Sequence, residues 1–168
     1  MDIYNAVRRK ANIDTRLAPQ LNDINKWLEK LCEAGWSTLY EPTPGEEIRD
    51  RFILTLCSSW QKQLIAEYGD TVCLDSTHNT CCGNNDEKIF LSTILARDHV
   101  TGHGVRLAFM LTNQESHYPL EHFLKWLRRA CQFTPNMIMI DFSNTEALAI
   151  RKSFPNLIIH ISYCYWHL

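Results

Sequence analysis

The chain has 168 residues, of which 45% are hydrophobic and 21% are charged, and its formal net charge is −2. This length suits one domain of ordinary size, and the composition is typical of a soluble globular protein and excludes a largely disordered chain. The near-neutral charge provides no general basic surface, so charge alone neither supports nor excludes work on DNA.

The sequence also limits the cellular compartment. No segment approaches the ~18–20 consecutive apolar residues of a membrane helix, and the amino terminus lacks the pattern of a signal peptide. The seven cysteines are odd in number and follow no disulfide spacing, and several lie inside apolar runs. This usage is typical of reduced, buried thiols and favours the cytosol or the nucleus.

The first 70 residues are expected to form an α-helical N-terminal segment. Apolar residues recur at helical spacing between Leu21 and Leu31, and Gly35 is the predicted stop. After a turn-rich break, a second helix is predicted from about Glu46 to Tyr68, because apolar residues recur at every fourth position along it.

From residue 71 the pattern changes to that of an α/β domain. The predicted elements are strands at 71–77, 88–98 and 105–112, a helix at 116–132, a strand at 137–141, a helix from Ser143 to about Phe154, and a strand at 157–163. The first three strands are separated by short turn clusters and are expected to form an antiparallel meander. The four consecutive apolar residues Met137–Ile140 suit a strand buried on both faces. The order β-β-β-α-β-α-β therefore predicts a mixed sheet with helices on its faces.

Two aspartates come at the ends of predicted strands, Asp75 after the first and Asp141 after the fourth. The element order resembles the ribonuclease-H-like fold, in which these two strands are parallel neighbours, so the two carboxylates would converge at one edge. Paired carboxylates repel each other unless a cation intervenes or one is protonated, and Mg²⁺ or Mn²⁺ suits oxygen ligands of this kind. Alternatively, each aspartate merely caps the turn or helix that follows it.

Two further patterns bear on the site. Ser143 followed three residues later by Glu146 is a capping-box pattern, so Glu146 is expected to close the start of the last helix. Cys164 and His167 form a C-x2-H pattern near the carboxyl end. Zinc needs four ligands and only half of a site is visible, so zinc is not expected in this chain, and a buried thiol beside an ordinary histidine is the alternative.

Together these stretches resemble the Mutator-like element (MULE) transposase domain. The resemblance covers about residues 71–168 and rests on ordered motifs at Val72–Thr80, Ile89–Asp98, Gly104–Asn113, Phe123–Leu127, Ile138–Ser143, Glu146–Ile150, Phe154–Pro155 and Cys164–His167.

The resemblance implies a DDE-type catalytic core that cuts and rejoins DNA with Mg²⁺ or Mn²⁺. By the same resemblance, Asp75 and Asp141 are the first and second catalytic aspartates and the metal ligands, and Cys164 and His167 are the family's C-x2-H motif. It also implies a nuclear protein that binds DNA, with homo-oligomerisation possible, and neither a membrane nor a small-molecule cofactor is expected.

One departure from the family qualifies this expectation. The third catalytic carboxylate should lie on a helix after His167, and the sequence contains no such helix. We therefore expect a helical segment at 1–70 followed by a partial transposase domain at 71–168, truncated before the final helix, from an incomplete or domesticated transposase. The alternatives are a non-catalytic DNA-associated or protein-interaction module and an unstable, pseudogene-like product.

Overall fold

The computed structural model describes residues 24–41, 51–82 and 88–164. The chain divides into two compact units, 1–36 and 37–168. In the first unit, the described helix α2 (Ile24–Glu33) confirms the helix predicted in this region, although none of its residues is buried. Gly35 ends it as predicted, because its φ of 82° lies in the left-handed region that glycine adopts without strain.

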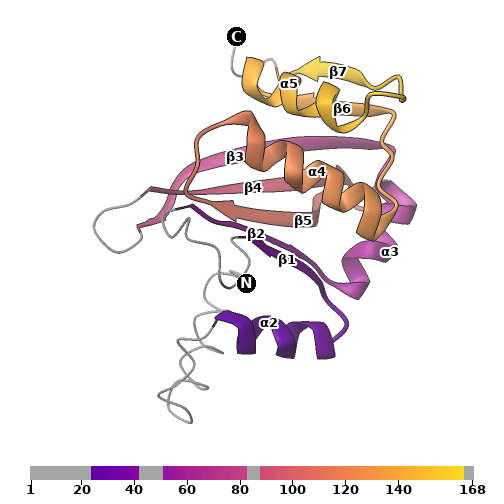
Figure 1. Ribbon diagram of the computed structural model, residues 1–168. Coiled ribbons are helices and arrows are strands. Elements are labelled where there is room, and N and C mark those ends of the chain that lie inside the picture. The colour runs from indigo at the N-terminus through magenta and orange to yellow at the C-terminus, as the bar shows by residue number, and fades with distance from the viewer. Residues whose placement is uncertain (1–23, 42–50, 83–87, 165–168) are drawn as a thin grey trace. The chain divides into compact units, whose positions relative to one another are not determined.

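The second unit is built on a seven-stranded mixed sheet. Its strands are β1 (Ser37–Glu41), β2 (Ile53–Cys57), β3 (Thr71–Cys82), β4 (Lys88–Arg97), β5 (Gly104–Thr112), β6 (Met137–Ile140) and β7 (His160–Tyr163). Their order across the sheet is β1-β2-β5-β4-β3-β6-β7. Four neighbouring pairs are antiparallel, namely β1–β2, β2–β5, β5–β4 and β4–β3. The pairs β3–β6 and β6–β7 are parallel (Figure 1). The predicted meander and the order of elements after residue 71 are therefore confirmed.

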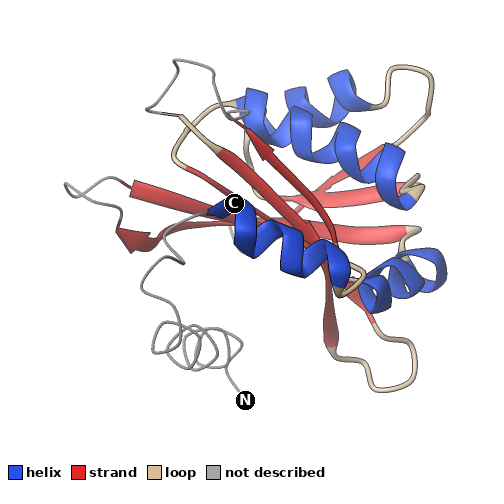
Figure 2. Cartoon of the chain, turned by 60° about the horizontal axis from the view of Figure 1, so that its bottom comes forward, coloured by secondary structure: helices blue, strands red, loops and turns tan. Residues whose placement is uncertain are grey.

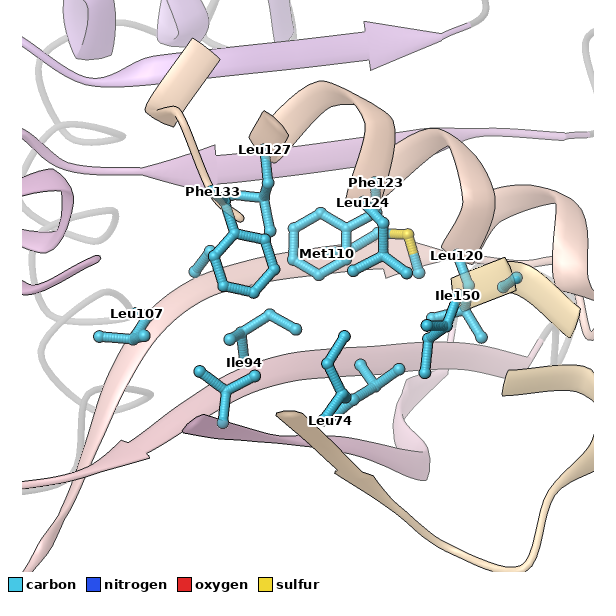
Figure 3. Packing of buried hydrophobic residues seen from close by; sticks show 14 of the residues in the cluster. Leu74, Ile94, Leu107, Met110, Leu120, Phe123, Leu124, Leu127, Phe133 and Ile150 are labelled. Atoms are coloured by element: carbon cyan, nitrogen blue, oxygen red, sulfur yellow. The ribbon is translucent and has the colours of Figure 1, made fainter. Parts of the chain in front are cut away.

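Three helices accompany this sheet: α3 (Ser59–Tyr68), α4 (His117–Cys131) and α5 (Asn144–Ser153). Helices α4 and α5 lie side by side over the same face (Figures 1 and 2). The apolar residues of α4 recur at helical spacing, so they form one stripe that faces the sheet. Figure 3 shows Leu124 of α4 and Ile150 of α5 pointing toward Leu74 of β3, and all three are at most 1% exposed. No helix among the described residues has the length and apolar character needed to cross a membrane.

The prediction of an all-helical segment before residue 71 is wrong. Residues 37–41 and 53–57 are strands that extend the sheet, and α3 begins only at Ser59. Strand β2 lies between β1 and β5 in the sheet, and consecutive residues of it are buried, which means that both of its faces are covered. The fourfold apolar spacing of the sequence extended across this strand and the following helix. The start of α3 is set by Ser58, whose side chain accepts a hydrogen bond from the Gln61 N–H in a complete capping box.

Two predictions about the central strands also need correction. Strand β3 continues to Cys82, so Asp75 lies within the strand and not at its end. Part of the predicted turn after it, residues 83–86, lies outside the described residues. Strand β6 is not buried on both faces, since Ile138 and Ile140 are fully buried while Met139 is 37% exposed on the face away from α4 and α5.

Candidate functional site

The two candidate aspartates lie on neighbouring parallel segments. Strand β3 pairs with β6 in a register that matches Thr71 with Met137 and Cys73 with Met139. Continuing the same register by two residues brings Asp75 level with Asp141, the first residue after β6. Because side chains two apart on a strand share a face, Asp75 lies on the face of Cys73 and Met139, and Asp141 begins the turn that follows β6. The strand pairing thus gives the neighbouring positions that the sequence predicted.

Both aspartates are partly exposed and differ in how their backbone is held. Asp75 pairs with Thr93 of β4, and its Oδ2 accepts a hydrogen bond of 3.4 Å from the Thr77 hydroxyl. Asp141 lies in the short connection to α5, where its carbonyl accepts a hydrogen bond of 2.6 Å from the Ser143 N–H. One carboxylate therefore comes from a strand inside the sheet and the other from a tight turn.

The pKa of the Cys73 thiol depends on the acidic groups near it. Burial raises the pKa of its thiol, and Asp75, Cys164, Asp141 and Glu146 contribute to the rise, which brings it to about 11. A thiol surrounded in this way stays protonated at neutral pH, so Cys73 is not a nucleophile here. The same interactions indicate that Cys73 lies within electrostatic range of Asp75, Cys164, Asp141 and Glu146.

Cys164 of the predicted C-x2-H pattern directly follows β7. Its N–H donates a hydrogen bond of 2.8 Å to the Ile140 carbonyl, so Cys164 continues the parallel ladder next to Asp141. Its partner His167 lies outside the described residues, so the structure does not bring the pair together.

Glu146 is a third acidic residue in this region, and its predicted role as a capping residue is wrong. Only half of the capping box forms: the Ser143 hydroxyl accepts a hydrogen bond of 3.3 Å from the Glu146 N–H. The return bond cannot form because the Ser143 N–H already donates to the Asp141 carbonyl. The Glu146 side chain is instead 5% exposed, and its Oε2 has no hydrogen-bond partner.

Burial raises the pKa of Glu146 to about 7, and the charges of Asp141 and Asp75 contribute to the rise, while the nearby Ser76 hydroxyl lowers it. The side chain lines a cavity of about 130 Å³ whose other walls include the hydroxyls of Ser76, Ser92 and Thr112. Glu146 thus lies beneath the sheet, on the helix-covered side. The signal that could have revealed this position is its helical spacing from the buried residues Ala149 and Ile150, which places all three on the inward face of α5.

Among residues 24–41, 51–82 and 88–164, no three His, Cys, Asp or Glu side chains gather closely enough to hold one metal ion. Glu146 is therefore not a third ligand beside Asp75 and Asp141. Two carboxylates still fit Mg²⁺ or Mn²⁺, because these ions keep several waters and are commonly held by one or two carboxylates together with substrate phosphate. The all-oxygen donor set of the pair favours such hard cations over zinc.

Residues 71–168 match the family model described as the MULE transposase domain. No curated protein matches the chain.

Proposed function

Because the chain belongs to the MULE transposase domain family, we propose that residues 71–168 form a DNA-processing core of ribonuclease-H-like architecture. Its function is transposase-derived, and membership of a transposase family suggests that its partner is DNA. The nucleus, where chromosomal DNA lies, is the compartment that this function requires. The intact reaction of such a core is cleavage of a DNA strand and its transfer to a new site.

The observation that carries this proposal is the register of β3 and β6, which brings Asp75 level with Asp141. In the proposed site these two carboxylates hold Mg²⁺ or Mn²⁺ against a DNA phosphate. When bound, such an ion supplies charge neutralisation at the phosphate and lowers the pKa of a coordinated water.

The protein itself orients the two carboxylates and concentrates negative charge at the site. Pairing with Thr93 orients the backbone of Asp75, and the turn closed by Ser143 orients that of Asp141. Glu146 adds a further negative charge behind the pair when it is ionised. No basic residue is among those whose charges act on Glu146 or Cys73 here, so the site attracts cations and would repel phosphate without them.

The decisive experiment is calorimetric titration of the chain with Mn²⁺, in parallel with the double variant Asp75→Asn, Asp141→Asn. A matched control is Glu29→Gln, Glu33→Gln, which removes two exposed negative charges from α2 in the other unit. We expect binding by the wild type and the control and its loss in the aspartate variant.

Equal binding by all three proteins would contradict the metal site. The chain would then act as a non-catalytic DNA-associated or protein-interaction module, and the role assigned to the aspartates would be abandoned. Circular dichroism of each variant separates loss of a ligand from loss of the fold.

A further inference from the structure

Two exposed aromatic rings lie near the carboxyl ends of β6 and β7. Phe142 directly follows Asp141 and is 68% exposed, and Tyr163, the last residue of β7, is 42% exposed. Their ring centroids are 5.2 Å apart and their planes are inclined by 53°, so they form one continuous apolar surface. Large apolar side chains that cluster on a surface in this way commonly mark a binding site.

The aromatic pair continues into a groove. A cavity of about 310 Å³ lies between α5 and β7, at the edge of the sheet seen in Figure 1, and Tyr163 forms part of its wall. Its other walls include Ile150, Arg151, Phe154, His160 and Ile161. This volume is at the lower end of the range for small-ligand sites.

The groove carries a positive charge, whereas the Asp75 and Asp141 pair is negative. Arg151 is exposed and makes no ion pair with the described part of the chain, and His160 is also exposed. An exposed guanidinium beside an apolar, aromatic wall suits a phosphate joined to a planar base.

We propose that this groove, together with Phe142 and Tyr163, binds an unpaired nucleotide of a DNA strand. The base stacks on the Phe142 and Tyr163 rings, and Arg151 faces the backbone phosphate. The nucleotide is unpaired because a base inside a duplex already has both faces stacked on its neighbours. This inference rests on the proposed function, since it takes DNA as the ligand.

The test compares two fluorescein-labelled single strands of equal length, one with normal bases and one fully abasic, by fluorescence anisotropy. Stacking of one base on an aromatic side chain corresponds to a change of about tenfold in affinity. We expect Phe142→Ala to weaken binding of the normal strand by about this factor and to leave the abasic strand unchanged. Phe142→Tyr should restore binding.

The matched control is Trp60→Ala on α3, because Trp60 is 60% exposed and belongs to neither the groove nor the aspartate site. It should bind both strands as the wild type does. Equal binding of the two strands by the wild type, an equal loss on both strands in Phe142→Ala, or no binding at all would overturn the nucleotide site and would favour a protein partner for the apolar surface.

Repeating the titrations with Mn²⁺ and with a chelator separates this inference from the proposed function. If Phe142→Ala weakens binding of the normal strand while Mn²⁺ and the aspartate double variant have no effect, the nucleotide site stands and the metal site fails. If Mn²⁺ strengthens binding through the aspartates but Phe142→Ala has no effect, the metal site stands and the nucleotide site is wrong.

Discussion

Replacing Glu146 by glutamine should stabilise the protein in a manner that depends on pH. Glutamine has almost the same shape but carries no charge at any pH. The Glu146 carboxyl is 5% exposed and its Oε2 has no partner, so ionisation leaves a negative charge in a poorly solvated position close to Asp141 and Asp75.

The magnitude follows from the pKa. Burial and the two aspartates raise the pKa of Glu146 from 4.5 to about 7. Between these values the folded state keeps a proton that the unfolded state has released, so stability falls as pH rises through this interval. Each pKa unit corresponds to about 1.4 kcal/mol. The free energy of unfolding of Glu146→Gln, relative to wild type, should therefore grow by about 3 kcal/mol between pH 4 and pH 8.

Urea unfolding at pH 4, 5, 6, 7 and 8, in a buffer with a metal chelator, measures this difference directly. Other titrating groups are common to both proteins and cancel in the comparison. Glu67→Gln, which removes an exposed carboxylate from α3, is the control and should follow the wild-type pH dependence. A constant difference between Glu146→Gln and wild type at all five pH values would refute the assignment of a buried carboxyl with a raised pKa.

Two further predictions concern the start of α3 and the thiols of Cys57 and Cys131. Ser58→Ala removes the capping box of α3 and should lower the free energy of unfolding by about 1 kcal/mol. Urea unfolding should show a lower midpoint with an unchanged slope. An unchanged midpoint would contradict the stabilising role of the cap. Cys131 should react with iodoacetamide before Cys57, because a hydrogen bond with Cys57 and the charge of Lys62 lower the Cys131 pKa, while Cys57 is fully buried and its pKa is raised. Mass spectrometry gives the order of labelling, and faster modification of Cys57 would contradict it.

The positions of Asp75 and Asp141 were predictable because they depend on topology. The order of elements after residue 71 resembles that of the ribonuclease-H-like fold, in which the first and fourth strands are parallel neighbours, and this resemblance predicted that the two acids come close. Paired residues of β3 and β6 lie 66 positions apart in the sequence. This offset could not be read from the sequence, since it depends on how the two strands are aligned along each other when the core packs.

Glu146 was not predictable in the same way. The pattern from Ser143 to Glu146 suits a capping box, and the choice between capping and burial depends on a competing donor. In the structure, the Asp141 carbonyl accepts a hydrogen bond from the Ser143 N–H in the turn after β6. This N–H is therefore not available to the Glu146 side chain. Such a competition between neighbouring hydrogen bonds has no signature in residue spacing, whereas the inward direction of the side chain does, through its spacing from Ala149 and Ile150.

The strands before residue 71 illustrate a different limit. Apolar residues at every fourth position continue from a strand into a helix, so periodicity alone cannot find the boundary at Ser58. Strand β2 is buried on both faces and so lacks the alternation of apolar and polar residues that marks a half-exposed strand, and it is recognised through its pairing with β1 and β5.

The contrast between the two aspartates bears on how the site would adapt to DNA. Asp75 is held within β3, where neighbouring strands lie on both sides, so its backbone has little freedom to move. Asp141 and Phe142 lie in the connection from β6 to α5, and connections of this kind open and shift at lower cost than paired strands. Adjustment to a bound strand should therefore come from the Asp141 side, where a carboxylate and an exposed aromatic ring move as one turn. In the proposed site, the sheet would supply a fixed reference in Asp75, and the turn would supply the part that fits itself to the ligand.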